Sequence, residues 1–185
     1  GMRLADWAPG VAQANAATNA SFVALYGQEW GVISNGGHVL IYGIDSLIGW
    51  ESGNYQIYVP QSDYISNTGL FKRLNQNGNA FATYAHPSTS DYDNVYGIAY
   101  NGRVDSAVVG CAVESGPAMS TVTTYNDYPS SMGFLSYYLK MLSKGYHLGP
   151  LMDHDTHYTN FGRANENRLV VLATSLTKAN LLAAM

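Results

Sequence analysis

The stretch Phe81-Ala-Thr-Tyr-Ala-His-Pro87 decides how this chain is expected to fold. Its five apolar-leaning residues are typical of a buried strand, and Gly78 just before them ends a helix expected over residues 62–77. A further helix is expected at 92–101, and the next apolar run, 106–113, is the clearest strand in the sequence. Strands that alternate with helices predict an α/β fold with a largely parallel sheet.

The same alternation continues outward in both directions. The remaining strands are expected at 22–26, 39–42, 148–152 and 168–173, and the remaining helices at 6–20, 132–144 and 178–185. Ser130 or Ser131 is expected to cap the helix at 132–144, and Thr177 the last one. With 185 residues, of which 46% are hydrophobic, the chain has enough apolar material for one domain, residues 1–185, with its own core.

Composition excludes several classes of function. Charged residues make up only 12% of the chain, the net charge is −4, and no Lys/Arg cluster occurs. We therefore expect no nucleic-acid binding and no attachment to a membrane through a basic face. The single cysteine, Cys111, lies in an apolar run and is interpreted as a buried hydrophobic residue. A surface rich in Tyr, Asn and Gly with little charge leans toward a location outside the cytoplasm.

Candidate metal ligands stand beside the expected strands. Glu29 follows the first strand, His38 precedes the second, and His86 follows the third, with Pro87 holding its backbone extended. Asp155 and His157 follow a later strand, and their spacing of two puts both side chains on one side of an extended segment. Divalent cations prefer such carboxylate and imidazole ligands, and strand ends at one sheet edge bring distant residues together.

Each of these residues also has an ordinary explanation. Glu29 alone fits a solvated loop carboxylate, and His38 alone fits a hydrogen-bonded histidine without a metal. The neighbours Asp153 and His154 leave the register of the Asp155 motif open.

Three more residues have two possible roles. Glu114, at a strand end, is either a residue that holds a ligand imidazole or a surface acid. Arg163 and Arg168 are either phosphate-binding residues or surface charges, and His147 is interpreted as a structural histidine.

At these residues the chain resembles the PHP (polymerase and histidinol phosphatase) family of metal-dependent phosphoesterases. The resemblance runs from about residue 21 to the end. It rests on Phe22-Val-Ala-Leu-Tyr-Gly-Gln-Glu-Trp30, Gly37-His-Val-Leu-Ile-Tyr-Gly43, Tyr84-Ala-His-Pro87, Asp155-Thr-His157, Arg168-Leu-Val-Val171 and Ser175-Leu-Thr-Lys178. It implies a TIM-like, distorted seven-stranded βα barrel with two or three metal ions at the carboxyl ends of the strands.

The resemblance also implies roles for single residues. Glu29 would bridge two metals, His38 and His86 would complete the ligands of one, Asp155 would bind the other, and His157 would bind a third. Glu29, Asp155 and His157 would thereby take part in catalysis. The His-x-His and Asp-His motifs with which the family begins do not occur before Glu29. The chain is therefore expected to be a truncated, incomplete barrel.

The expected function is hydrolysis of a small-molecule phosphoester by metal-activated water, with zinc, manganese or iron as the cofactor. Two other hypotheses remain open. One is a non-catalytic remnant that serves as a binding or assembly module, with a homo-oligomer covering its open sheet edges. The other is a metal-dependent hydrolase of a different ester or an amide, because the ligand set would be the same.

Overall fold

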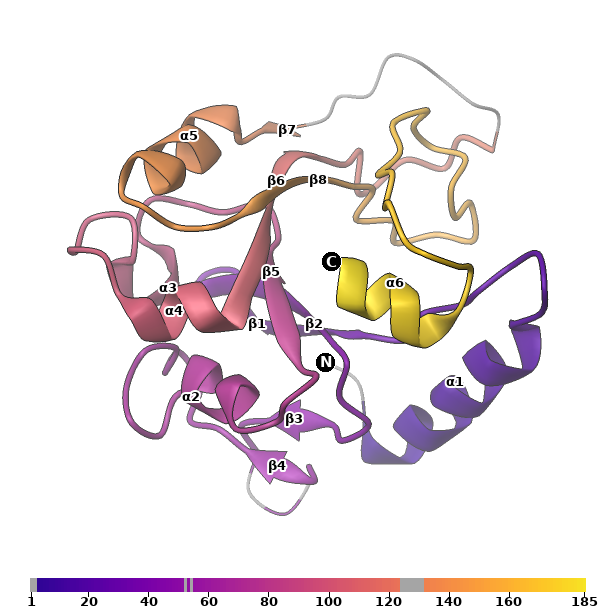
Figure 1. The fold of residues 1–185 in the computed structure, drawn as a ribbon, viewed down its shortest axis with the longest axis horizontal. Helices are drawn as coiled ribbons and strands as arrows, with labels where there is room; N and C mark the ends of the chain where they lie inside the picture. Colours follow the sequence, from indigo (N-terminus) through magenta and orange to yellow (C-terminus); the bar gives the residue numbers. More distant parts are fainter. Residues whose placement is uncertain (1–2, 52, 54, 124–131) are drawn as a thin grey trace.

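A mixed six-stranded sheet forms the centre of the molecule (Figure 1), here a computed structural model that describes residues 3–51, 53, 55–123 and 132–185. The strands run in the order β1-β2-β5-β6-β7, and β8 also pairs with β6. Their bounds are β1 (Gln28–Val32), β2 (Gly37–Tyr42), β5 (Phe81–Tyr84), β6 (Val108–Ser115), β7 (Met132–Gly133) and β8 (Gly149–Asp153). A separate small sheet pairs β3 (Ile48–Gly49) with β4 (Ile57–Tyr58) in parallel.

The helices are short apart from the first. Their bounds are α1 (Leu4–Ala17), α2 (Leu70–Asn75), α3 (Asp91–Asn94), α4 (Gly102–Ala107), α5 (Leu135–Ser143) and α6 (Lys178–Ala184). The side chain of Thr177 accepts a hydrogen bond from the Asn180 amide and caps α6, as expected, whereas Ser130 and Ser131 lie outside the described residues. Across the described ranges, no helix has both the length and the apolar character needed to cross a membrane.

The expected seven-stranded barrel is wrong. In the described part of the chain the sheet stays open, and its strands are not all parallel. Within this sheet, β1-β2, β2-β5 and β6-β7 are antiparallel pairs, and β5-β6 and β6-β8 are parallel pairs. A βα barrel requires every strand to run parallel to its neighbours, so the antiparallel half of this sheet excludes that architecture.

The cause of the difference is a tight hairpin near the N-terminal end of the sheet. Asn35 and Gly36 lie in the turn between β1 and β2, and an Asn-Gly pair is a strong hairpin signal. The strand expected at 22–26 is irregular instead, and Phe22 is 55% exposed. The strand expected at 168–173 is not formed either, and Leu172 is 90% exposed. Both segments are apolar, but neither has a sheet neighbour to pair with.

The core lies between the sheet and helices α2, α4 and α5, and it is unusually rich in aromatic rings. Tyr84 on β5 stacks on Tyr92 with ring centroids 4.3 Å apart, and Tyr137 on α5 meets Tyr84 edge-on at 5.9 Å. Offset-stacked and edge-on ring pairs stabilise a fold beyond the area they bury. These rings hold the end of β5, and with it His86, against α3 and α5.

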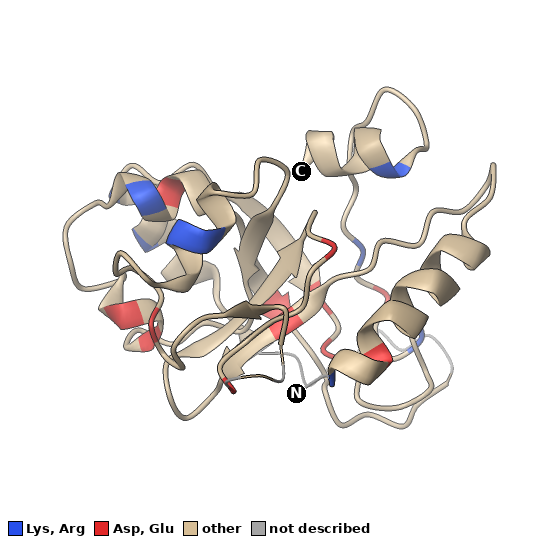
Figure 2. Cartoon of the chain, turned by 90° about the horizontal axis from the view of Figure 1, so that it is seen from below, with Lys and Arg blue, Asp and Glu red and all other residues tan. Residues whose placement is uncertain are grey.

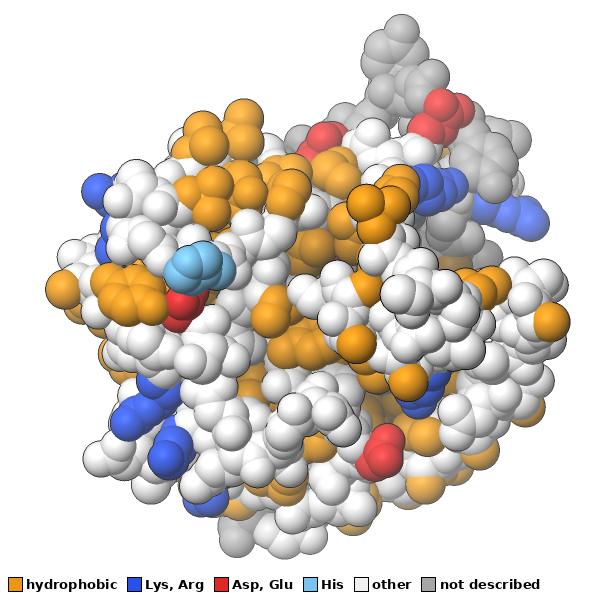
Figure 3. Space-filling view, viewed as in Figure 1, with side chains coloured by type: hydrophobic (Ala, Val, Ile, Leu, Met, Phe, Trp, Pro, Cys, Tyr) orange, Lys and Arg blue, Asp and Glu red, His pale blue; other side chains and the backbone are white. Residues whose placement is uncertain are grey.

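Charge is sparse and unevenly placed. The chain contains nine Lys and Arg residues, all within the described ranges, and none of them lies in a β-strand (Figure 2). Figure 3 shows that hydrophobic and uncharged polar side chains cover most of one face of the molecule, with a few scattered charges. No strand of the sheet therefore contributes a permanently positive side chain.

Candidate metal centre

Three neighbouring strands bring Glu29, His38 and His86 together. Glu29 lies on β1, His38 on β2, and His86 two residues after the end of β5. The hairpin register pairs Glu29 with Leu40 and Gly31 with His38. Alternate residues of a strand share a face, so Glu29 and His38 are diagonal neighbours on the same side of the hairpin. The Ala85 amide donates to the His38 carbonyl, which continues the β2-β5 ladder up to His86.

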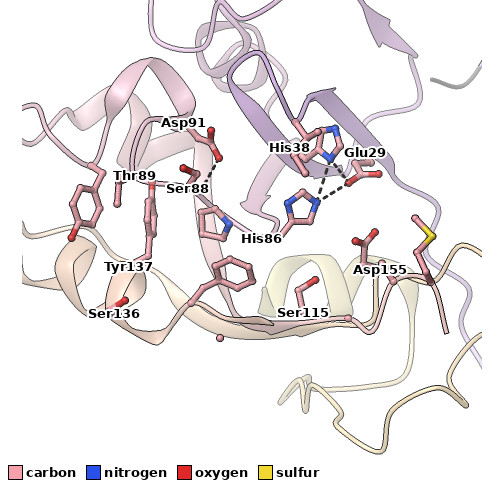
Figure 4. A pocket seen from close by; sticks show the side chains of 18 of the residues that line it. Glu29, His38, His86, Ser88, Thr89, Asp91, Ser115, Ser136, Tyr137 and Asp155 are labelled. Carbon is pink, nitrogen blue, oxygen red and sulfur yellow. Dashed lines mark hydrogen bonds and ion pairs between the residues drawn. The ribbon is translucent and has the colours of Figure 1, made fainter. Parts of the chain in front are cut away.

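The ligand atoms of this cluster are close to one another (Figure 4). Glu29 Oε1 lies 2.8 Å from His38 Nδ1 and 3.5 Å from His86 Nε2, and the two imidazole nitrogens are 3.3 Å apart. Glu29 is exposed and both histidines are partly buried. Within the described residues, this is the one group of three or more His, Cys, Asp or Glu side chains whose ligand atoms all lie within 4.8 Å of one another.

The donor set fits a divalent cation. Ligands bound to zinc at about 2.1 Å in a tetrahedral arrangement are separated by about 3.4 Å. The three observed separations of 2.8, 3.3 and 3.5 Å bracket that value. One carboxylate and two imidazoles also match the three protein ligands of catalytic zinc sites, which leave a fourth position for water.

Two features of the backbone hold the histidines in place. The hydroxyl of Tyr92 lies 2.8 Å from the His38 carbonyl and 2.9 Å from the Ala85 carbonyl, so its single proton is shared between two strand ends. Gly37, directly before His38, has φ +88°, and a Cβ there would lie 2.6 Å from the carboxyl group of Asp91. Only glycine fits this position without displacing that group.

Without a cation, hydrogen bonds hold the cluster together. The hydrogen bond from His38, followed by that from His86, holds the pKa of Glu29 well below its ordinary value. The hydrogen bond to Glu29 raises the pKa of His86, although burial opposes this shift. Glu29 is therefore ionised at neutral pH, and a metal ion binding here would replace a proton on His86.

The cluster stands at one end of a cleft of about 860 Å³. Figure 4 shows Glu29, His38 and His86 at that end, and Thr89, Ser136 and Tyr137 at the other. A cleft of this volume is within the range of small-molecule sites. A second cavity of about 300 Å³ adjoins it, and Glu29, His86, Ser115, Asp155 and His157 line both.

Asp155 and His157 line the cleft but lie outside the three-residue cluster. Asp155 has φ +50°, and its carboxyl group points toward Glu29 and His86 (Figure 4). Burial, followed by the charge of Glu29, raises its pKa. His157 is half exposed and its Nδ1 lies 2.7 Å from the Asp155 carbonyl oxygen. His157 Nδ1 also lies 3.7 Å from Asp155 Oδ1, and both side chains line both cavities, so the two side chains lie together although the backbone turns at Asp155.

Asp153 and His154, the competing members of this motif, face different surroundings. Asp153 lines only the second cavity, and burial of its carboxyl group raises its pKa to about 6. The Nε2 atom of His154 lies 2.8 Å from the Asn167 carbonyl oxygen, so this histidine supports a loop.

The remaining predicted site residues lie away from the cleft. Arg168 donates hydrogen bonds to the carbonyls of Asn165, Asn167 and Gly162, and neither Arg163 nor Arg168 lines either cavity. His147 is exposed and lies 2.9 Å from Asp105. The two arginines thus stand where a substrate phosphate in the cleft would not meet them.

The cleft also contains residues that the sequence did not point to. Ser115, one position after Glu114 on β6, lines both cavities, because adjacent strand residues face opposite sides. Its side-chain oxygen is buried without a hydrogen-bond partner among the described residues. Asp91 lines the cleft as well and accepts a hydrogen bond from the Ser88 amide. The sequence Glu114-Ser-Gly116 at the strand end does not by itself indicate whether Glu114 or Ser115 faces the cleft.

Comparisons with family models, curated proteins and solved structures found no match to this chain. The resemblance to the PHP family therefore stays a prediction, and the geometry of the cluster is the basis for any functional conclusion.

Proposed function

We propose that this chain is a metal-dependent hydrolase that holds one divalent cation between Glu29, His38 and His86. The observation that supports this is the approach of three ligand atoms from three different strands to within 3.5 Å of one another. Groups with shifted pKa values tend to cluster at functional sites, and Glu29 and His86 are two such groups at one end of a cleft. Zinc, manganese and iron all suit this donor set.

A cation at this position would lower the pKa of a bound water and supply hydroxide at neutral pH. The chain's own residues would then orient the water and move its proton. Asp155 points toward the cluster, where its carboxylate could accept a proton from the bound water, and burial raises its pKa. The expectation of a phosphoester substrate comes from the family resemblance alone.

The test is the metal content of the purified full chain after incubation with zinc or manganese, measured by elemental analysis. We expect about one ion per chain, and for His86→Ala a loss of at least roughly 100-fold in metal affinity. His147→Ala is the matched control, because it removes an equally polar histidine from a surface pair with Asp105. Its metal content should equal that of the wild type.

A wild-type protein that takes up no metal, or a His86→Ala variant that keeps its full affinity, would contradict the proposal. Either result would favour the non-catalytic binding or assembly module instead. Circular dichroism of both variants separates loss of the ligand from loss of the fold.

A further inference from the structure

The cleft has no permanent cation of its own. None of the residues that line it is Lys or Arg, whereas Glu29, Asp91 and Asp155 contribute three carboxyl groups. All nine Lys and Arg residues lie within the described ranges, and none of them lines the cleft. A phosphate dianion entering the cleft would face these carboxylates with only imidazoles and the proposed metal ion to attract it.

Aromatic side chains line the cleft at the end away from the metal cluster. Tyr137 lies there (Figure 4), and the rings of Tyr96 and Tyr137 lie with centroids 5.2 Å apart; Pro87 and Phe134 also line the cleft. A planar aryl group is the kind of ligand that such a wall stabilises, through apolar burial and ring contacts. The ring wall and the metal cluster belong to one cleft, so one substrate can occupy both.

Several neutral hydroxyl groups also line the cleft. Ser115 is 4% exposed, and its unpartnered oxygen points into the cleft beside His86 and Asp155 (Figure 4). A buried hydroxyl without a partner is costly, and a carbonyl oxygen of a bound molecule would satisfy it. Ser88, Thr89 and Ser136 add further hydroxyls along the wall. This set suits an uncharged carbonyl group better than a dianion.

We propose that the substrate of this site is an uncharged carboxylic ester or amide that carries an aryl group, and that it is not a phosphoester; this inference rests on the proposed metal-dependent hydrolysis. The aryl group lies against Tyr96, Phe134 and Tyr137, and the carbonyl oxygen accepts a hydrogen bond from Ser115. A water molecule loses one proton, and the resulting hydroxide adds to the carbonyl carbon. The bond to the leaving oxygen or nitrogen then breaks with both electrons going to that atom, which takes up the proton that the water lost.

The first test compares two aryl ligands that differ in charge, acetanilide and phenyl phosphate, by calorimetry on the zinc-loaded protein. We expect acetanilide to bind at least about tenfold more tightly, with little change on adding salt, because an uncharged ligand is not screened. Turnover of 4-nitroacetanilide should exceed that of 4-nitrophenyl phosphate by a similar factor in kcat/KM.

The second test places a cation in the cleft. Ser136 on α5 is exposed and lines the cleft, whereas Ser143, on the same helix, does not. Ser136→Arg should raise the affinity for phenyl phosphate by at least about tenfold, because Arg binds phosphate through paired hydrogen bonds. Ser143→Arg adds the same charge away from the cleft and should leave both affinities unchanged.

The outcomes separate this inference from the function on which it rests. Zinc-loaded protein that prefers phenyl phosphate, or that binds neither ligand, would overturn the substrate assignment and leave the metal site standing. An equal response of Ser136→Arg and Ser143→Arg would also overturn it, since the cleft would then not be where the ligand binds. A protein that binds no zinc would overturn the proposed function itself, and elemental analysis measures the zinc content independently of ligand binding.

Discussion

The pKa values of Glu29 and His86 are shifted in opposite directions, and the shift of His86 determines how metal uptake should depend on pH. The pKa of His86 is raised chiefly by Glu29, so this imidazole keeps its proton to a higher pH than a free histidine does. The metal must displace that proton. We therefore expect zinc affinity to fall by about tenfold for each pH unit below the pKa of His86. Zinc titrations across the neutral range measure this, and an affinity independent of pH would contradict it.

Asp153 offers a second prediction for a single residue. Burial raises its pKa from 3.8 to about 6; Asp155 and Glu29 add to the shift and His86 opposes it. The unfolded chain loses this proton at a lower pH than the folded chain does. The free energy of unfolding of the metal-free protein therefore falls as the pH rises from about 3.8 to about 6, and stays lower above that window.

Asp153→Asn removes this penalty. It should raise the free energy of unfolding by roughly 2 kcal/mol above about pH 7, and the gain should vanish below about pH 4. Urea denaturation at both pH values measures the difference. A gain of equal size at both values would mean that the side chain acts through packing and not through its charge.

Among the elements, α3 is the one that ties the histidine-bearing strands together. Tyr92, Asp93 and Asn94 all take left-handed φ values near +57°, which bulky residues rarely adopt. This turn carries the Tyr92 hydroxyl to the carbonyls of His38 and Ala85. It also places Asp93 where its carboxylate accepts from the Tyr64 and Ile65 amides. The unusual backbone is thus held by contacts at both ends.

Tyr92→Phe should lower the free energy of unfolding by roughly 1–2 kcal/mol, because two buried carbonyls lose a shared donor. It should also weaken zinc binding several-fold, since His38 and His86 lose a common anchor. Tyr100→Phe, which removes a surface hydrogen bond to Asp105, is the matched control and should change neither quantity. Unchanged zinc binding in Tyr92→Phe would mean that the strands alone position the histidines.

At the scale of the whole molecule, the open sheet leaves strand edges without a partner. β1, β7 and β8 each pair with only one strand among those described. The segment after β8 exposes Phe161, Val170 and Leu172, each by more than 70%. Open edges and exposed apolar side chains are liabilities that proteins usually cover. These features support the proposal that two copies of the chain associate.

We expect light scattering to detect dimers at micromolar concentration, and the double variant Val170→Ser, Leu172→Ser to shift the chain toward monomer. Leu139→Ser, at an exposed leucine on α5, is the control and should leave association unchanged. A wild-type protein that stays monomeric at every concentration would contradict association through this surface.

Local sequence signals predicted part of this structure well. The strands near 81–85 and 148–152 and the helix capped by Thr177 occur close to where they were expected, because apolar runs and capping residues act over short distances. The Asn35-Gly36 turn is an equally local signal, and it makes β1 and β2 antiparallel. The barrel was implied by the family resemblance, and this hairpin is incompatible with it.

The identity of the candidate ligands was accessible from residue chemistry, since Glu29, His38 and His86 each stand beside a strand. Strand pairing, which depends on contacts between distant segments, decided that these three meet while Asp155 and His157 stay at the side of the cleft. Neither the register that turns Ser115 inward nor the absence of any lysine or arginine from the cleft is visible along the chain. Both depend on which faces pack together, and packing is settled by the molecule as a whole.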